Sequence, residues 1–163
     1  MVPGLCYGRT DVPLAEDPAR HAEALRPLLP AGAPLYSSPL TRCRQLAERL
    51  HPAPILDDRL REIDFGEWEM RPWNALDRRL IDAWAAAPLD FAPPGGEPVA
   101  ALRARVRACL AELPDEAILV AHGGVFKACA AELTSDGEWS ALFFDYGKAS
   151  LIEDGAFAWR NRG

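Results

Sequence analysis

The chain passes from strand to helix within AILVAHGGVFKACAAEL, residues 117–133. Five apolar residues, 117–121, open this stretch, which is typical of a strand that is buried on both faces. His122 and the pair Gly123-Gly124 follow, and residues 125–133 then have the pattern of a helix. A buried strand that leads at once into a helix favours a parallel sheet with helices packed on it. This stretch therefore predicts an α/β fold.

Strands and helices alternate through the rest of the chain as well. We predict strands at 34–37, 55–56, 142–146 and 149–153, with a final extended piece at 156–160. We predict helices at 18–29, 40–50, 73–87 and 99–113, the last because its apolar residues recur at steps of three and four. The expected fold is a three-layer sandwich, in which helices cover both faces of a mostly parallel central sheet. Residues 1–163 are expected to form a single domain.

Composition excludes several functional classes. The 163 residues carry a net charge of −6, which does not favour nucleic acid as a partner. No apolar run approaches the roughly 20 residues that a membrane span needs, and the first residues lack the pattern of a signal peptide. We therefore predict a cytoplasmic protein that binds neither nucleic acid nor a membrane.

Metal binding is not favoured either. The four cysteines, at positions 6, 43, 109 and 129, form no CxxC pair, and the three histidines are scattered. A zinc site needs a closer grouping of such ligands. We predict reduced thiols, no metal and no cofactor. The sequence carries no signal for an oligomeric state.

Two side chains stand where a parallel sheet binds its ligands, just beyond the carboxyl ends of the strands. His122 follows the strand at 117–121, and Arg42 lies in the first turns of the helix after the strand at 34–37. A helix N-terminus attracts anions, and an arginine there can donate two hydrogen bonds to a phosphate. Either residue would equally suit a surface position. Arg42 and Arg44 point to different faces, so at most one of them faces the crevice.

The segment LREIDFGEWE, residues 60–69, places four acidic residues among aromatic and aliphatic ones. A carboxyl group with such neighbours tends toward a raised pKa, as a general acid requires. The same segment would also suit a solvated loop whose apolar side chains lie in the core. The candidate acids are Glu62, Asp64, Glu67 and Glu69.

Two other histidines have simpler explanations. Arg20-His21 has the letters of an Arg-His phosphatase motif, but it lies inside a predicted helix and no apolar strand precedes it. His51 stands next to Pro52 at a predicted helix end, where capping explains it. No GxxxxGK[ST], GxSxG or HExxH motif is present, and no GxGxxG follows a strand. Nucleotide-binding, serine-hydrolase and zinc-protease sites are therefore not indicated.

The order of five motifs is more specific than any one of them. Along the chain come YGRTDVPL (7–14), SSPLTRCRQLAERL (37–50), DDRLREIDFGEWE (57–69), PPGGE (93–97) and VAHGG (120–124). This order resembles the histidine phosphatase superfamily, with its phosphoglycerate-mutase-like fold. Within the superfamily it resembles the bacterial α-ribazole phosphatases of cobalamin synthesis. The resemblance covers nearly the whole chain, including the closing DYGKASLIEDG (145–155).

The resemblance implies a phosphomonoester hydrolase that uses no metal. In that family a histidine attacks phosphorus, and water then releases phosphate from the phosphohistidine. His122 and Arg42 would contact the transferring phosphoryl group, and Glu62 would protonate the leaving oxygen. The partner would be a small phosphorylated metabolite such as α-ribazole 5′-phosphate. The implied substrate contacts are Gly8, Arg9 and Gly123.

The family's first strand, which ends in Arg-His, has no counterpart in these residues. The chain opens instead with MVPGL and a turn-forming GRTD. The resemblance therefore implies that the first strand and the nucleophilic histidine are absent, and that a gap separates the strand at 117–121 from the one at 149–153. Pro98 and Met70 also depart from the family pattern, and we expect them to change substrate preference.

Functions of two classes follow from these motifs. The first is a phosphatase whose first strand lies outside these residues, so that the 163-residue chain is inactive. Its substrate would be α-ribazole 5′-phosphate or, alternatively, a sugar phosphate. The second is a pseudoenzyme that binds phosphorylated ligands without turnover. Because His122, Arg42 and Glu62 are all present, we favour the enzyme.

Overall fold

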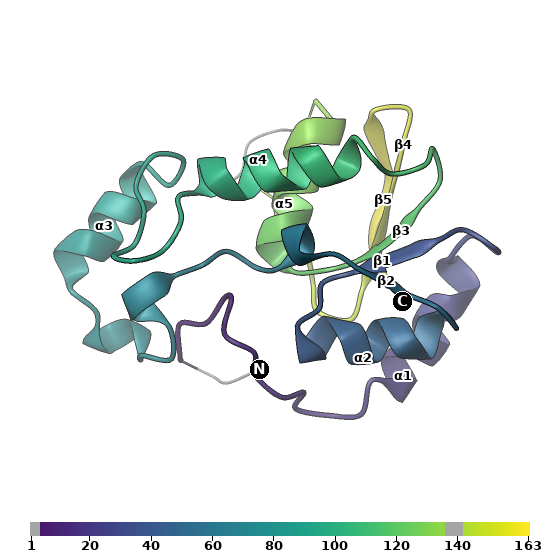
Figure 1. The fold of residues 1–163 in the computed structure, drawn as a ribbon, viewed down its shortest axis with the longest axis horizontal. Coiled ribbons are helices and arrows are strands. Elements are labelled where there is room, and N and C mark those ends of the chain that lie inside the picture. The colour runs from purple at the N-terminus through teal and green to yellow at the C-terminus, as the bar shows by residue number, and fades with distance from the viewer. Residues whose placement is uncertain (1–3, 136–141) are drawn as a thin grey trace.

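A three-stranded parallel sheet lies at the centre of the fold (Figure 1). The structure is a computed structural model that describes residues 4–135 and 142–163. In spatial order the strands are β2 (Ile55–Leu56), β1 (Leu35–Ser37) and β3 (Ile118–Val120). Tyr36 of β1 pairs with Ile55 on one side and with Leu119 on the other. The predicted parallel sheet is confirmed, and its strands lie at the predicted positions.

Helices cover both faces of this sheet (Figure 1). One side carries α1 (Ala19–Leu25) and α2 (Thr41–Leu50), and the other carries α4 (Val99–Leu110) and α5 (Gly123–Leu133). Successive strand residues face opposite sides of a sheet. Leu35 and Val120 accordingly pack against α2, whereas Tyr36 and Leu119 pack against the larger apolar cluster to which α4 and α5 contribute. The predicted layered α/β arrangement is therefore confirmed.

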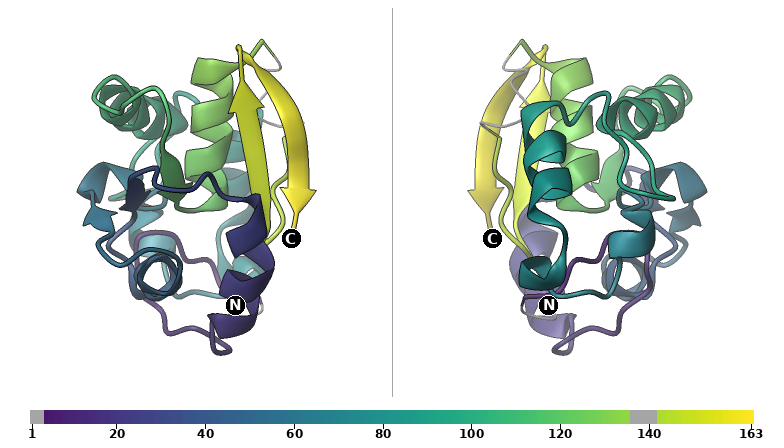
Figure 2. Two further views of the ribbon diagram at one scale, coloured as in Figure 1. Left: turned by 90° about the vertical axis from the view of Figure 1, so that its right-hand side faces the viewer. Right: turned by 90° about the vertical axis from the view of Figure 1, so that its left-hand side faces the viewer.

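The C-terminal strands form a second, separate sheet. β4 (Ala149–Glu153) and β5 (Ala156–Arg162) make an antiparallel hairpin, which lies beside α5 as a layer of its own (Figure 2). The ring of Phe144 joins the two, 5.7 Å from Phe126 of α5 and 6.0 Å from Phe157 of β5 between centroids. Within the described residues β3 pairs only with β1, and β4 pairs only with β5. Side chains, not a hydrogen-bond ladder, therefore connect the hairpin to the rest.

The strand predicted at 142–146 is wrong. Residues 142–145 have no regular structure, and Tyr146 begins a turn. Leu142 is buried, but Phe143 and Tyr146 are largely exposed. A strand needs a neighbour for its backbone groups, and this segment pairs with no strand that the structure describes. The apolar run reflects a few anchoring side chains and not a sheet position.

Three predicted helices are shorter than expected, and the one predicted at 99–113 ends at Leu110. The region 73–87 begins with a 3₁₀ turn, η4 (Trp73–Ala75), and α3 (Arg78–Ala86) follows. The Asp77 carboxylate accepts a hydrogen bond from the Arg79 N–H at 2.9 Å, which fixes the start of α3 at that point. The helix predicted at 18–29 ends at Leu25, and η1 (Arg26–Leu28) follows it. Pro27 has no N–H with which to extend the α-helical ladder.

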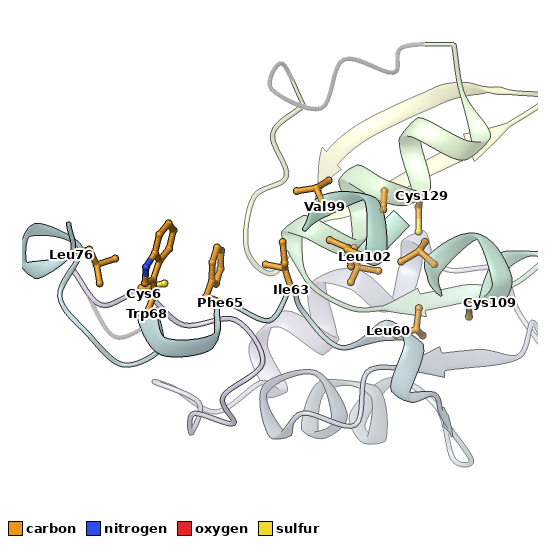
Figure 3. Packing of buried hydrophobic residues seen from close by; sticks show 13 residues of the cluster. Cys6, Leu60, Ile63, Phe65, Trp68, Leu76, Val99, Leu102, Cys109 and Cys129 are labelled. Atoms are coloured by element: carbon orange, nitrogen blue, oxygen red, sulfur yellow. The ribbon is translucent and has the colours of Figure 1, made fainter. Parts of the chain in front are cut away.

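An irregular segment with 3₁₀ turns η2 (Asp58–Leu60) and η3 (Gly66–Trp68) carries the chain from β2 toward α3. Figure 3 shows Leu60, Ile63, Phe65 and Trp68 following one another along it, continuous with the core under α4. The Phe65 ring lies edge-on to Trp73 and Trp84, with 5.8 Å between centroids in both pairs. These side chains anchor the segment, while the polar residues between them remain available to the site.

The loop at 93–97 packs directly against this segment. The Glu67 N–H donates to the Pro94 carbonyl at 2.8 Å, and the Glu97 N–H donates to the Asp64 carbonyl at 2.9 Å. Gly66 has a φ of 55°, and a Cβ there would overlap the Pro94 carbonyl oxygen. Glycine is therefore required at position 66 by its conformation and by the close approach of the two chains.

The two residues that depart from the family pattern hold definite backbone positions. Met70 has a left-handed φ of 61°, a conformation that glycine adopts more readily. Pro98 immediately precedes α4. Their effect on substrate preference stays a prediction.

Among the described residues, no helix has the length and apolar character that would let it cross a bilayer.

Candidate active site

His122, Arg42 and Glu62 lie together at the N-terminus of α5. His122 stands between β3 and α5, Arg42 lies in the first turn of α2, and Glu62 comes from the segment after η2. The Arg42 Nε–H donates to His122 Nδ1 at 3.2 Å. The Glu62 carboxylate accepts a hydrogen bond from the Gly124 N–H at 3.0 Å. Three side chains from distant parts of the sequence thus meet at one helix terminus.

The contacts of His122 define its tautomer. Nδ1 accepts from Arg42, because a guanidinium can only donate. The neutral ring therefore carries its hydrogen on Nε2, which lies 2.8 Å from Ser38 Oγ and donates to it. Cys43 Sγ lies 3.5 Å from Nε2 and 3.3 Å from the Ala121 carbonyl oxygen. The imidazole is held from three sides in a defined orientation.

His122 is neutral at physiological pH. Only 8% of the residue is exposed, and this burial, followed by the charges of Arg42 and Arg105, holds the pKa of His122 well below its usual value. A histidine that is neutral in the folded state but protonated in the unfolded state makes stability fall as the pH falls below the unfolded pKa, about 6.5.

We expect His122 to make the protein less stable at pH 5.5 than at pH 7.5. Over these two pH units its contribution is about 1.4 kcal/mol if the folded imidazole stays neutral throughout. His122→Gln should remove this part of the pH dependence of the urea midpoint. The matched control is His51→Gln, the same substitution at the end of α2 and away from the site. An equal pH dependence in wild type and His122→Gln would contradict the assignment.

Arg42 links the site to the loop at 7–10. It donates to the Thr10 carbonyl at 2.9 Å and to the Gly8 carbonyl, and its guanidinium lies 5.6 Å from the centroid of the Tyr7 ring. Three of its five N–H donors are thus engaged, and the other two have no acceptor among the described residues. Those two remain available for an anion.

Arg44 faces the other way, as predicted for one of the two arginines. It pairs with Glu48 at 3.0 Å on the outer surface of α2.

The first turn of α2 is held by Asp11, whose carboxylate accepts from the Thr41 N–H at 2.8 Å and from Thr41 Oγ1 at 2.7 Å. This cap fixes the helix turn from which Arg42 extends.

The Glu62 carboxyl group is turned into the protein. Its Oε1 accepts from the Ile63 N–H at 2.9 Å, and its Oε2 accepts from Gly124. Burial raises the pKa of Glu62, and it outweighs these two hydrogen bonds and the charges of Arg42 and Arg105, which lower it. A carboxyl group that holds its proton to higher pH beside an anion site suits proton transfer to a leaving oxygen.

The three implied substrate contacts differ in their positions. A Cβ at Gly123 would meet no atom within 4 Å, so the N-terminus of α5 is open to an approaching group. Gly8 is buried, and a Cβ there would overlap the Ile63 carbonyl oxygen, which gives this glycine a packing role. The half-exposed Arg9 side chain pairs with Asp64 at 3.3 Å.

The sequence did not predict the roles of two residues that shape the site, Glu69, which was only one of four candidate acids, and Ser38. The Glu69 carboxylate accepts from the Arg9 and Thr10 N–H groups, each at 2.7 Å, and orders the loop that Arg42 also holds. Ser38 is fully buried and contacts His122. The position of Ser38 directly after a strand is a signal that could have marked it. Nothing in the local pattern around Glu69 separates it from its acidic neighbours.

The assembled groups suit a phosphoryl group. A guanidinium with two unengaged N–H donors and an open helix N-terminus favour bound oxyanions, and the His122 imidazole and the partly buried carboxyl group of Glu62 lie beside them. Among the described residues, no group of three or more His, Cys, Asp or Glu side chains is placed to hold a metal ion.

Comparison with known proteins gives the class. The family model for the histidine phosphatase superfamily (branch 1) matches residues 2–154. The chain belongs to this superfamily. Within it, the chain is 30% identical to the adenosylcobalamin/alpha-ribazole phosphatase of Salmonella typhimurium, over 98% of this chain and 92% of that protein. It is 33% identical to the glucosyl-3-phosphoglycerate phosphatase of Mycobacterium tuberculosis, over 83% and 71%.

Solved structures agree. The phosphoglycerate mutase from Thermus thermophilus superposes with a TM-score of 0.80 at 35% identity, over 97% of this chain and 89% of that one. The alpha-ribazole phosphatase from Shigella flexneri also gives 0.80, at 26% identity over 99% and 89%. The chain spans 56% of the length of another curated relative, from Hydrogenobacter thermophilus, which is 31% identical over 63% of this chain.

Proposed function

We propose that this protein is a cytoplasmic phosphomonoester hydrolase that acts through a phosphohistidine. The observation that carries the proposal is the meeting of Arg42, His122 and Glu62 at the open N-terminus of α5. The cysteines also support a reducing compartment, because all four are buried and free.

Each of the three side chains has a role in this chemistry. A histidine nitrogen attacks phosphorus as the bond to the ester oxygen breaks, and protonated Glu62 gives its proton to that oxygen. Water then attacks phosphorus, Glu62 takes a proton from it, and the N–P bond breaks to release phosphate. Arg42 neutralises the equatorial oxygens, and the Nε2–H of His122 donates to one of them in place of Ser38 Oγ, its partner in the structure.

We infer that the attacking histidine is none of the three histidines in these 163 residues. His122 is held by Arg42 and Ser38. His21 pairs with Glu16 on the surface of α1, and His51 accepts from the Ala53 N–H after α2. We propose that the nucleophile lies on a strand between β3 and β4, which are not paired with each other in the described residues. The 163 residues alone would then be inactive.

We propose α-ribazole 5′-phosphate as the substrate. Support comes from the Salmonella relative, which matches along nearly its whole length, and from the Shigella structure. A sugar phosphate is the alternative, supported by the mycobacterial relative. Phosphate binding without turnover is the second candidate function, because the residues present supply an anion site but no attacking histidine.

Phosphate binding tests the site directly. We expect inorganic phosphate to shift the NMR signals of His122 and Gly124 in the 163-residue chain. Arg42→Lys should weaken this binding by about tenfold or more, because lysine cannot reproduce the forked donor geometry. Arg44→Lys, two residues further on α2, is the matched control and should bind as wild type. Unchanged His122 and Gly124 signals at saturating phosphate would show that the anion site is wrongly assigned.

A further inference from the structure

Arg105 of α4 holds the backbone of the segment that carries Glu62. Its guanidinium donates to the Arg61 carbonyl at 2.7 Å, to the Glu62 carbonyl at 3.1 Å and to the Arg59 carbonyl. Only 17% of the Arg105 side chain is exposed. One side chain thus fixes three carbonyl oxygens within four residues of chain.

Glu97 completes this arrangement. Its carboxylate pairs with Arg105 at 2.7 Å and accepts from the Asp64 N–H at 3.1 Å. The Glu97 N–H donates to the Asp64 carbonyl. The segment 59–64 is therefore held on both sides of Glu62, by Arg105 before it and by Glu97 after it.

The neighbouring arginines of α4 do something different. Arg103 and Arg107 both pair with Glu132 of α5, at 2.8 and 2.7 Å. Residues four apart share a helix face, and the residue midway between them points to the opposite side. Arg105 alone of the three therefore faces the segment 59–62.

We propose that Arg105, together with Glu97, is a positioning residue for Glu62. Glu62 has no helix or strand of its own to orient it, since it lies between η2 and η3. Its carboxylate reaches the Gly124 N–H only while the backbone at 59–64 is held against α4. The functional meaning of this inference rests on the proposed role of Glu62 as the acid, but the positioning itself can be measured separately.

The pKa of Glu62 depends both on nearby charges and on how deeply the carboxyl group is buried. The charged and titratable groups that act on it or respond to it come from four other parts of the fold. They are Arg42 and Cys43 of α2, Arg105 of α4, Lys127 of α5 and Tyr146 near the C-terminus. Removing a positive charge raises the pKa of a carboxyl group, whereas releasing the group into water returns a raised pKa toward its ordinary value. The two effects have opposite signs.

The experiment follows the Glu62 carboxyl signal by ¹³C NMR across pH in the 163-residue chain, with Glu62→Gln to assign it. Arg105→Lys keeps the charge but not the fork. We expect it to lower the pKa of Glu62 toward the ordinary range. We also expect it to reduce protection of the Gly124 N–H against hydrogen exchange by about tenfold, the order expected for one charge-assisted hydrogen bond. Glu97→Gln, a milder change, should move both readouts in the same direction by less. Arg103→Lys, the matched control on α4, should leave both unchanged.

Other outcomes overturn the inference. If Arg105→Lys and Glu97→Gln leave both readouts at their wild-type values, Arg105 does not position Glu62. If Arg105→Gln raises the pKa of Glu62 while Arg105→Lys leaves it unchanged, Arg105 acts only through its charge. Equal changes in Arg103→Lys would indicate general loosening of α4. A failure of the proposed function has a different signature, since phosphate would then leave the site signals of the wild-type chain unmoved.

Discussion

A chain extended at its N-terminus by a strand that ends in Arg-His should hydrolyse p-nitrophenyl phosphate at an enzyme-like rate, whereas the 163 residues alone should not. The difference expected is on the order of 10⁴-fold or more, the size of effect seen when a covalent catalyst gains or loses its nucleophile. Arg42, His122 and Glu62 are already assembled at α5. The extension would supply the proposed nucleophile.

The control separates chemistry from folding. The same extension ending in Arg-Ala should pair with β3 and β4 equally well, and each buried backbone group that gains a partner contributes about 1–3 kcal/mol. Both extensions should therefore raise the urea midpoint, but only the Arg-His form should become radioactive after reaction with a ³²P-labelled ester. If the unextended chain already turns over at an enzyme-like rate and loses this activity in His122→Ala, another group is the nucleophile.

Gly66→Ala should destabilise the protein by at least about 3 kcal/mol, enough to prevent folding of a marginal domain. Alanine would have to adopt the left-handed φ of 55°, and its Cβ would overlap the Pro94 carbonyl oxygen. Because backbone atoms on both sides would have to move, the contacts between the 64–67 segment and the 93–97 loop would be lost. Urea unfolding followed by tryptophan fluorescence measures the effect, since Trp68 directly follows this segment.

Gly95→Ala is the matched control for that substitution. Gly95 also has a positive φ, of 70°, but the nearest atom to its Cβ position is 3.8 Å away. We expect Gly95→Ala to lower the free energy of unfolding only by the cost of the left-handed conformation, about 1 kcal/mol. The difference between the two variants measures the close approach of the two segments. Equal losses would mean that the left-handed conformation alone accounts for the cost at Gly66.

The sequence predicted the sheet because its signals are local. The apolar run at 117–121 and the Gly123-Gly124 turn are sufficient to place β3 and the start of α5. The run at 142–146 is also largely apolar, but strand formation depends on a neighbouring strand, and the local sequence does not encode that neighbour. The helix predicted at 73–87 is present but begins later than predicted, since Asp77 starts α3 partway through an otherwise continuous pattern.

The sequence also predicted only part of the candidate site. His122 and Arg42 follow strand ends, so the topology of a parallel sheet places them at one edge. The supports of the site depend on tertiary contacts. The three arginines of α4 are chemically identical. Arg105 alone contacts the Glu62 carbonyl because of its position around the helix and because the 59–62 backbone lies on that side.

The separate β4–β5 hairpin has a consequence for how the protein unfolds. It touches the rest of the described chain through groups such as Gly163 beside Leu25 of α1 and Phe157 beside Phe144, with no ladder to the parallel sheet. Detaching it breaks side-chain packing and the hydrogen bonds of the Asn161 side chain to Asp145 and Phe143. We therefore expect the amides of the hairpin to exchange with solvent as one cooperative unit, below the free energy of global unfolding. A strand inserted between β3 and β4 would merge this unit with the parallel sheet, and the chain would then unfold as one.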